Sequence, residues 1–296
     1  MLNPARIRGD GGRSAGTGKA SPWLTCSLVP EEMVLMAGVE LQVREWGASM
    51  AGTPVLVLHG LLGSSRNWMA AGKALAASHR VLAADLRNHG ESPHLRPMDY
   101  PAMVDDLLGL LDRLELPAVH LIGHSMGGKA AMLLTCRFPE RVRSLTVVDI
   151  APRAYPPRWE KEFALLRRLP VERMQSRAEA EAELSTEIRD WAFRQFLLSN
   201  LERAEEGGFR WTVPLQLLEE SLPELFEQVP PPGEVAWPGP ALFLRGEKSR
   251  FVGEDDLALI REFFPAAKLE TVAGAGHNVH FDQRDRFVRR VRAHLE

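Results

Sequence analysis

Residues 118–129 read Ala-Val-His-Leu-Ile-Gly-His-Ser-Met-Gly-Gly-Lys, and an apolar run over residues 130–135 follows. Within them, residues 123–127 match the pattern G-x-S-x-G, between a run typical of a buried strand and one typical of a helix. A serine on a tight strand-to-helix turn needs glycine two residues before and after, because the turn brings those backbones together. Gly123 and Gly127 meet that need. The pattern alone also fits an ordinary glycine-rich turn, but its flanks favour Ser125 as a nucleophile.

Strand-like and helix-like runs alternate along most of the chain. This alternation predicts an α/β fold with a mainly parallel sheet and helices on both faces. The eight expected strands are residues 33–36 and 39–46, which suit an antiparallel hairpin, then 55–58, 81–84, the run before Gly123, 144–148, 241–244 and 268–272. The expected helices of this core are residues 68–77, 101–114, the run after Ser125, 255–264 and 284–295.

Residues 151–237 break the alternation, since they are charged and helical and contain no buried-strand run. The candidate helices there are residues 158–168, 177–200, 215–220 and 223–229. A Pro-Pro-Pro-Gly cluster at residues 230–233 ends this segment. We therefore expect a helical cap at residues 151–237, inserted into a core formed by residues 33–150 and 238–296.

Composition narrows the classes of function and compartment. The 296 residues are 45% hydrophobic and 25% charged with a formal net charge of -3, which indicates a soluble globular protein and gives no basic field for nucleic acid. No apolar stretch approaches the roughly 20 residues that span a bilayer. The two cysteines, Cys26 and Cys136, form no disulfide framework, and Cys136 suits a small buried thiol. These features favour a cytoplasmic protein.

The first 32 residues differ from the rest, being rich in Gly, Ser, Ala and Arg. We expect residues 1–32 to form a disordered tail on which no catalysis depends. The alternative is an organelle transit peptide, because such segments are rich in Arg and Ser and poor in acids. That alternative would place the protein in the mitochondrial matrix.

A serine hydroxyl becomes nucleophilic when a histidine takes its proton, and that histidine needs a carboxylate to fix its tautomer. On the fold with this serine turn, the acid and then the histidine follow the serine along the chain. The histidines far enough after Ser125 are His277, His280 and His294. His277 follows Gly-Ala-Gly directly after the last expected strand, on a turn that can aim its ring at Ser125. We expect His277 to be the general base, with His280 packed nearby and His294 on the surface.

The acid is expected at Asp149. Many proteins with this fold carry the acid in a Gly-x-x-Asp turn after the strand here at residues 241–245, but the corresponding residue is Ser249. Asp149 ends a buried strand, where a carboxylate is costly unless it is paired. Asp255 and Asp256 are the rivals, although their position suits the capping and first turn of a helix. A further alternative is that Asp149 only caps the turn at residues 150–152.

Acyl transfer also needs donors for the tetrahedral oxyanion. On this fold they are the backbone N–H of the residue after the nucleophile and one from a loop near it. We expect these donors at Met126 and Leu61, with Gly60 allowing close backbone approach.

Three further polar residues are expected to support the site. His59 and His124 are interpreted as hydrogen-bonding rings, because no second ligand lies at metal-site spacing beside them. Asn88, in the Asn-His-Gly loop at residues 88–90, is expected to line the same strand ends. We expect no metal and no cofactor.

Four stretches together resemble one family, the α/β-hydrolase fold, and within it the bacterial acyl-esterase group related to the mitochondrial abhydrolase-domain protein eleven. They are Asp-Leu-Arg-Asn-His-Gly at 85–90, Gly-His-Ser-Met-Gly-Gly-Lys at 123–129, Val-Asp-Ile-Ala-Pro at 148–152 and Gly-Ala-Gly-His at 274–277. The resemblance runs from about residue 34 to 295 and implies an acid on the strand after the serine helix, in agreement with Asp149. Asn278, where an aromatic residue often follows the histidine, and the charged segment 158–168 depart from the group and bear on substrate size and polarity.

The combined hypothesis is a cofactor-free serine hydrolase of short acyl esters, with thioesters also implied by the resemblance. Its triad would be Ser125, Asp149 and His277, and its partner a small-molecule ester or thioester. One alternative is a carbon-carbon bond hydrolase or lyase on the same triad. Another is a non-catalytic scaffold that binds a partner through the cap.

Overall fold

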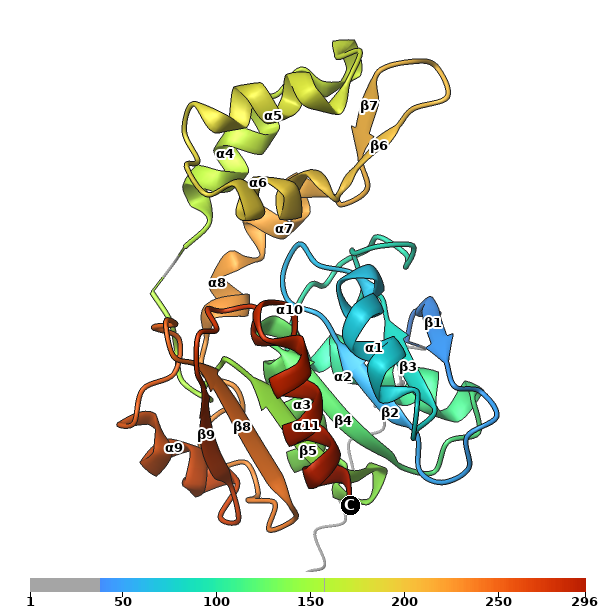
Figure 1. The fold of residues 1–296 in the computed structure, drawn as a ribbon, viewed down its shortest axis with the longest axis vertical. Coiled ribbons are helices and arrows are strands. Elements are labelled where there is room, and N and C mark those ends of the chain that lie inside the picture. Colours follow the sequence, from blue (N-terminus) through green and yellow to red (C-terminus); the bar gives the residue numbers. More distant parts are fainter. Residues whose placement is uncertain (1–37, 157) are drawn as a thin grey trace, which may run out of the picture. The chain divides into compact units, whose positions relative to one another are not determined.

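A sheet of seven strands forms the centre of the fold (Figure 1). The computed structural model describes residues 38–156 and 158–296. The strands lie in the order β1-β3-β2-β4-β5-β8-β9, and all neighbours are parallel except β1 and β3. Their bounds are β1 (Val43–Trp46), β2 (Val55–Leu58), β3 (Val81–Ala84), β4 (Val119–His124), β5 (Val142–Val148), β8 (Ala241–Gly246) and β9 (Lys268–Val272). The predicted α/β fold with a mainly parallel sheet is confirmed.

The eighth expected strand, residues 33–36, lies outside the described residues, as does the expected tail at residues 1–32. The strand expected at residues 39–46 is shorter than predicted, and as β1 it pairs with β3. The described part of the sheet thus has seven strands rather than eight.

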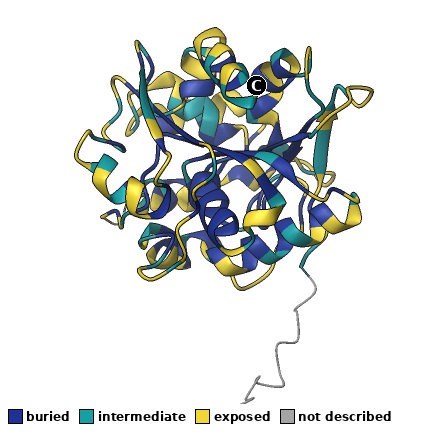
Figure 2. Ribbon diagram, turned by 90° about the horizontal axis from the view of Figure 1, so that it is seen from below, coloured by how far each residue is buried: buried dark blue, intermediate teal, exposed yellow. Residues whose placement is uncertain are grey.

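Alternate residues of each inner strand point to opposite faces of the sheet. In β2, Leu56 and Leu58 belong to the hydrophobic cluster on one face, whereas Val55 and Val57 belong to the cluster on the other. Helices α2 (Tyr100–Arg113), α3 (Met126–Arg137) and α9 (Asp256–Phe263) contribute to the first cluster, and α1 (Met69–Leu75) and α11 (Arg284–Leu295) to the second. Figure 2 shows the buried strands between helices whose outer sides are exposed. This explains why the inner strands are continuously apolar.

Between β5 and β8 the chain leaves the sheet, and we call this segment, residues 151–237, the insertion (Figure 1). Its elements are α4 (Glu160–Arg168), α5 (Arg177–Ser185), α6 (Trp191–Leu198), β6 (Leu201–Arg203), β7 (Phe209–Trp211), α7 (Leu215–Glu220) and α8 (Leu222–Phe226). One expectation for it was wrong, and one feature was not predicted. The helix predicted at residues 177–200 is two helices, because Asp190 caps a new helix by accepting from the N–H of Phe193. The insertion also contains a short antiparallel hairpin, β6–β7.

At the C-terminal end of α8, three consecutive backbone carbonyls, at residues 225–227, accept from two core side chains and from the first part of the insertion. The hydroxyl of Tyr100 donates to the first at 2.8 Å, the N–H of Tyr155 to the second at 2.8 Å, and the ammonium of Lys129 to the third. Lys129 is 2% exposed and lies over the rings of both tyrosines. Because carbonyls at a helix C-terminus have no intrahelical partner, these donors stabilise the point where the insertion returns to the core.

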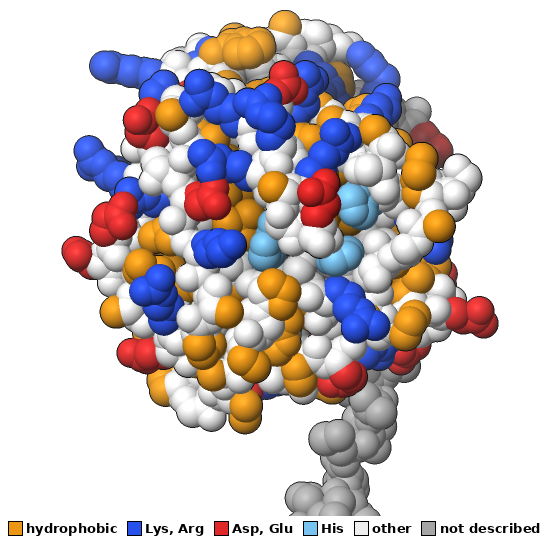
Figure 3. Space-filling view, turned by 60° about the horizontal axis from the view of Figure 1, so that its bottom comes forward, with side chains coloured by type: hydrophobic (Ala, Val, Ile, Leu, Met, Phe, Trp, Pro, Cys, Tyr) orange, Lys and Arg blue, Asp and Glu red, His pale blue; other side chains and the backbone are white. Residues whose placement is uncertain are grey.

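The surface carries charges of both signs. On the face shown in Figure 3, Lys and Arg side chains lie among Asp and Glu, with histidines between them. Within the described residues, no helix combines the length and the apolar content required to cross a membrane.

Candidate active site

Ser125 lies on the turn between β4 and α3. Its backbone has φ 51° and ψ -118°, a strained conformation for a residue with a side chain. A Cβ built on Gly123 would lie 2.3 Å from the carbonyl oxygen of Gly127, and one on Gly127 would lie 2.5 Å from that of His59. Both glycines are therefore required by close backbone contacts, which confirms the prediction from their spacing.

His277 and Asp149 are joined by a hydrogen bond. Asp149 follows β5, and His277 lies on the loop between β9 and the one-turn helix α10 (Val279–Asp282). His277 Nδ1 is 2.7 Å from Asp149 Oδ2, and the Asp149 side chain is fully buried while that of His277 is 27% exposed. Since a carboxylate only accepts, Nδ1 carries the proton, and in the neutral ring Nε2 keeps a free lone pair. This is the tautomer that a general base requires.

The buried carboxylate of Asp149 has three donors. Its Oδ1 accepts from the N–H of Gly246 at 2.9 Å. Its Oδ2 accepts from both His277 Nδ1 and the hydroxyl of Ser249. Three charge-assisted hydrogen bonds offset the cost of burying this charge. The carboxylate is thus bound to His277 and to the turn after β8, and not to the turn at residues 150–152 that was the alternative.

The rival acids have other partners. Asp256 accepts from Arg153 Nε at 2.9 Å and from the N–H of Gly253 at 2.8 Å. Asp255 is exposed and immediately precedes α9. Within the described residues, the carboxylate that contacts His277 is therefore that of Asp149.

Two aromatic rings border His277. The ring of Phe251 stacks on it, with centroids 3.9 Å apart and planes inclined by 21°. The centroid of the His124 ring lies 4.6 Å from that of the His277 ring, and His124 Nε2 donates to the backbone carbonyl of His277 at 3.0 Å. Because His124 directly precedes Ser125, this hydrogen bond connects the serine turn to the histidine loop.

Burial keeps the neighbouring histidines neutral. It lowers the pKa of His124 well below its usual value and that of His280 to about 3. The ring of His280 stacks on that of Trp68, with centroids 4.2 Å apart, and its centroid lies 4.9 Å from that of the His124 ring. The prediction that His280 packs near the site is confirmed.

The loop after β2 approaches the serine turn from the other side. A Cβ on Gly60 would lie 3.0 Å from His124 Nδ1 and 3.2 Å from Ser125 Cβ. His59 Nδ1 donates to the carbonyl of Gly60 at 2.8 Å, and its Nε2 accepts from the N–H of Leu86 at 3.0 Å. Burial lowers the pKa of His59, which keeps Nε2 unprotonated and able to accept. The rings of His59 and His124 both form hydrogen bonds to the backbone.

The two expected oxyanion donors are open. Met126 is the first residue of α3, where a backbone N–H has no intrahelical acceptor. Within residues 38–156 and 158–296, the N–H groups of Leu61 and Met126 donate to no other protein group. The adjacent N–H of Leu62 donates to His89 Nε2 at 3.1 Å, and burial lowers the pKa of His89 to about 3. His89 thereby orients the loop that carries Leu61.

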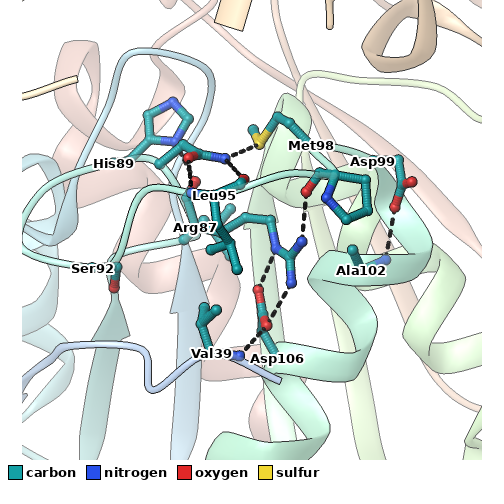
Figure 4. A network of polar contacts seen from close by, with 12 residues as sticks. Val39, Arg87, His89, Ser92, Leu95, Met98, Asp99, Ala102 and Asp106 are labelled. Atoms are coloured by element: carbon teal, nitrogen blue, oxygen red, sulfur yellow. Dashed lines mark hydrogen bonds and ion pairs between the residues drawn. The ribbon is translucent and has the colours of Figure 1, made fainter. Parts of the chain in front are cut away.

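Asn88 supports the loop after β3, whose residues Arg87, Leu95 and Met98 are labelled in Figure 4. Its side chain accepts from the N–H of Leu95 at 2.8 Å and donates to the carbonyl of Leu95 at 3.0 Å and to the sulfur of Met98 at 3.2 Å. Next to it, buried Arg87 binds Asp106 through two hydrogen bonds of 2.5 and 2.7 Å. Asn88 thus shapes this loop, which also carries His89.

The insertion approaches the site at two points. The buried Asn200 donates from Nδ2 to the carbonyl of Leu62 at 2.8 Å. The guanidinium of Arg158 lies 5.1 Å from the centroid of the Phe251 ring. The segment between β5 and β8 therefore contacts both the loop after β2 and the aromatic ring beside His277.

Sequence reasoning missed two residues of this arrangement, Ser249 and Phe251. It also missed the hydrogen-bonding role of His89. Ser249 had a signal, because it occupies the fourth position of a Gly-x-x-Asp-like turn. His89 belongs to the Asn-His-Gly motif, but the motif does not reveal which backbone group its ring binds. Phe251 had no signal, since its contact with His277 depends on how two distant loops meet.

The arrangement is suited to proton transfer and to stabilising an oxyanion. A serine on a strained turn, a histidine paired with a carboxylate and two open N–H groups are the parts used in acyl transfer. Among the described residues, no three His, Cys, Asp or Glu side chains are grouped so that they could hold a metal ion.

Known proteins match most of the chain. The family described as alpha/beta hydrolase fold matches residues 53–283. The sn-1-specific diacylglycerol lipase ABHD11 of Xenopus tropicalis is 37% identical over 86% of this chain and 81% of its own length. The Esterase YbfF of Escherichia coli (strain K12) is 36% identical over 82% of this chain and 93% of its own. A solved structure of a marine microorganism esterase has a TM-score of 0.83 at 37% identity and covers 86% of this chain and 99% of that one.

Proposed function

This chain belongs to the α/β-hydrolase family and is related to its esterases and lipases, and we propose that it is a serine hydrolase of short acyl esters or thioesters. One observation carries the proposal. His277 Nδ1 binds the buried carboxylate of Asp149 at 2.7 Å, on a loop hydrogen-bonded to the residue before Ser125. The rest of the histidine ring is thereby left to act on the serine hydroxyl.

In the proposed first step, Ser125 Oγ attacks the acyl carbon while its proton passes to His277 Nε2. Asp149 stabilises the imidazolium that forms and does not itself take the proton. The oxygen of the tetrahedral intermediate accepts from the N–H groups of Leu61 and Met126. When the intermediate collapses, His277 returns the proton to the departing alkoxide or thiolate, which leaves an acyl group on Ser125.

In the proposed second step, water repeats this chemistry in place of the serine. His277 Nε2 takes a proton from water, the hydroxide attacks the acyl carbon, and Ser125 leaves with that proton. The carboxylic acid is released and the free serine is restored. Apart from the substrate and water, the groups used in both steps belong to this chain.

We further propose that residues 151–237 form a cap over a core made of residues 33–150 and 238–296. The contacts of Asn200 and Arg158 near the site support a role for this segment in binding the acyl or alcohol part of the substrate. The name of the Xenopus tropicalis relative adds sn-1 esters of diacylglycerol to the candidate substrates.

The test combines covalent labelling with turnover. A fluorophosphonate probe should label the protein once per chain, and Ser125→Ala should abolish labelling and hydrolysis without lowering Tm by more than a few degrees. Ser185→Ala, at an exposed serine of α5, is the matched control and should behave like the wild type. A series of nitrophenyl esters, acyl thioesters and diacylglycerols then ranks the substrates by kcat/KM. Ester hydrolysis that persists in Ser125→Ala would refute the mechanism.

A further inference from the structure

Helix α11 presents a row of arginines on the side that faces away from the sheet. The residues that it buries in the core are Phe287, Val288 and Val291. Arg286, Arg289 and Arg290 lie on the opposite side of the helix, because residues three and four apart share a face. They line a surface hollow of about 380 Å³. We propose that this hollow is a binding site for a ligand that carries phosphate groups.

The positive charge extends beyond the first hollow. A second hollow, of about 350 Å³, adjoins it, because Arg289 and Arg290 line both. Lys268 and Glu270, on the edge strand β9, line the second hollow as well. Four cationic side chains and one carboxylate therefore surround the two hollows, a local charge of three positive units on a chain whose formal net charge is -3. Such a concentration of one sign attracts ligands of the other.

These cations keep donors that the protein does not use. Arg289 is exposed and forms neither a hydrogen bond nor an ion pair with another described residue. Arg286 gives one N–H to the carbonyl of Ala273 at 3.0 Å, and Arg290 is paired with Glu270. Since a guanidinium has five N–H donors, each of the three arginines retains donors for a ligand.

The arrangement favours phosphate over a single small anion. Like charges three and four residues apart on a helix repel each other, and cations in the first turn oppose the helix dipole. A ligand with several negative charges offsets both effects. A guanidinium also binds two oxygens of one phosphate at once, so three of them around one hollow suit a diphosphate or the headgroup of an acidic phospholipid.

The first hollow borders the loop that carries His277. Arg286 binds the carbonyl of Ala273, which directly follows β9 and begins the segment that leads to His277. The binding site is nevertheless separate from the proposed triad, and no group of the triad lines either hollow. The inference therefore does not rest on the proposed function, and binding can be measured in a chain that lacks the nucleophile.

The first experiment titrates the protein with pyrophosphate by calorimetry and follows Tm. We expect pyrophosphate to bind, to raise Tm and to bind more weakly as salt is added. Arg289→Gln should weaken binding at least about tenfold, as for the loss of hydrogen bonds to a charged group, and Arg289→Lys should lie between it and the wild type. Neither change should alter Tm without ligand. Arg173→Gln, at an arginine of the insertion whose side chain is 85% exposed, is the matched control and should bind like the wild type.

A second arm distinguishes free phosphate from lipid. Ser125→Ala, in which no lipid ester is cleaved under the proposed mechanism, is sedimented with vesicles of phosphatidylcholine or of equal parts of phosphatidylcholine and phosphatidic acid. Arg289-dependent binding of pyrophosphate indicates a free ligand, and Arg289-dependent sedimentation with the acidic vesicles alone indicates a lipid headgroup. If neither binds, or if Arg289→Gln binds both as tightly as the parent chain, the site does not exist, whatever esters the wild type hydrolyses.

Discussion

Asp149 is the single residue whose replacement best tests the proposed chemistry. Its carboxylate holds His277 in the tautomer that leaves Nε2 free, and an amide at this position can present its N–H₂ group to Nδ1 and stabilise the wrong tautomer. We expect Asp149→Asn to lower kcat about ten-thousandfold, the size of effect known for the same change in another triad. The measurement is kcat on the best nitrophenyl ester, with Tm as the test of folding.

The matched control for Asp149→Asn is Asp255→Asn, at the exposed rival acid that precedes α9. It should keep kcat within about twofold of the wild type, as is usual for surface substitutions away from special features. A large loss in Asp255→Asn together with an active Asp149→Asn would reverse the assignment.

Single residues could be predicted where a local pattern and a strand end coincide. Ser125 lies between glycines at a strand-to-helix turn, Asp149 ends a buried strand and His277 follows one, so each position could be read from a short stretch. Ser249 and Phe251 could not be read in this way. Their roles depend on side-chain contacts across β5, β8 and the loop after β9, over separations of about a hundred and of 26 residues.

Helices α3 and α8 are joined by the buried amino group of Lys129, which donates to a carbonyl at the C-terminal end of α8. Burial lowers the pKa of Lys129 from 10.5 to about 7, with a further lowering by Arg153 and an opposing effect of Glu227. A cation at the C-terminal end of a helix is favourable, but burying that cation is costly. The stability of the protein should therefore depend on pH in a range where most side chains do not titrate.

The sign follows from the protons bound in each state. Between pH 7 and 10.5 the unfolded chain binds a proton at Lys129 and the folded chain does not, so the free energy of unfolding rises with pH. From pH 7 to 8.5 we expect a rise of about 2 kcal/mol, measured by urea unfolding. Lys129→Met should remove most of this rise, whereas Lys73→Met, at an exposed lysine of α1, should retain it. If the free energy of unfolding of Lys129→Met rose with pH as steeply as that of the wild type, other groups would be the cause of the pH dependence.

The elements of the core were predicted more accurately than those of the insertion. Strands such as β9 have the expected bounds because a continuous apolar or alternating run can be recognised locally. In the insertion, residues 186–190 separate two helices although they contain neither Gly nor Pro. The strands β6 and β7 are three residues each, too short to show a period. Both features are decided by packing within the insertion.

Across the chain as a whole, the insertion is tied to the loop that carries Leu61. Asn200 and Leu62 are 138 positions apart in sequence, yet Asn200 Nδ2 donates to the carbonyl of Leu62 at 2.8 Å in buried surroundings. The N–H of Leu62, the residue after Leu61, donates to His89 Nε2. The loop after β2 is thus fixed from the core by a histidine and from the insertion by an asparagine.

This double attachment predicts that a change in the insertion alters turnover. Asn200→Ala leaves the buried carbonyl of Leu62 without this donor, which costs about 1–3 kcal/mol of stability. We also expect kcat to fall by up to about tenfold with KM little changed, because a looser loop places the N–H of Leu61 less accurately against the oxyanion. Ser199→Ala is the control, since this neighbouring side chain is exposed and bonds only within its own helix end, to Phe196. A lower Tm with an unchanged kcat would mean that the attachment stabilises the fold but does not position the loop for catalysis.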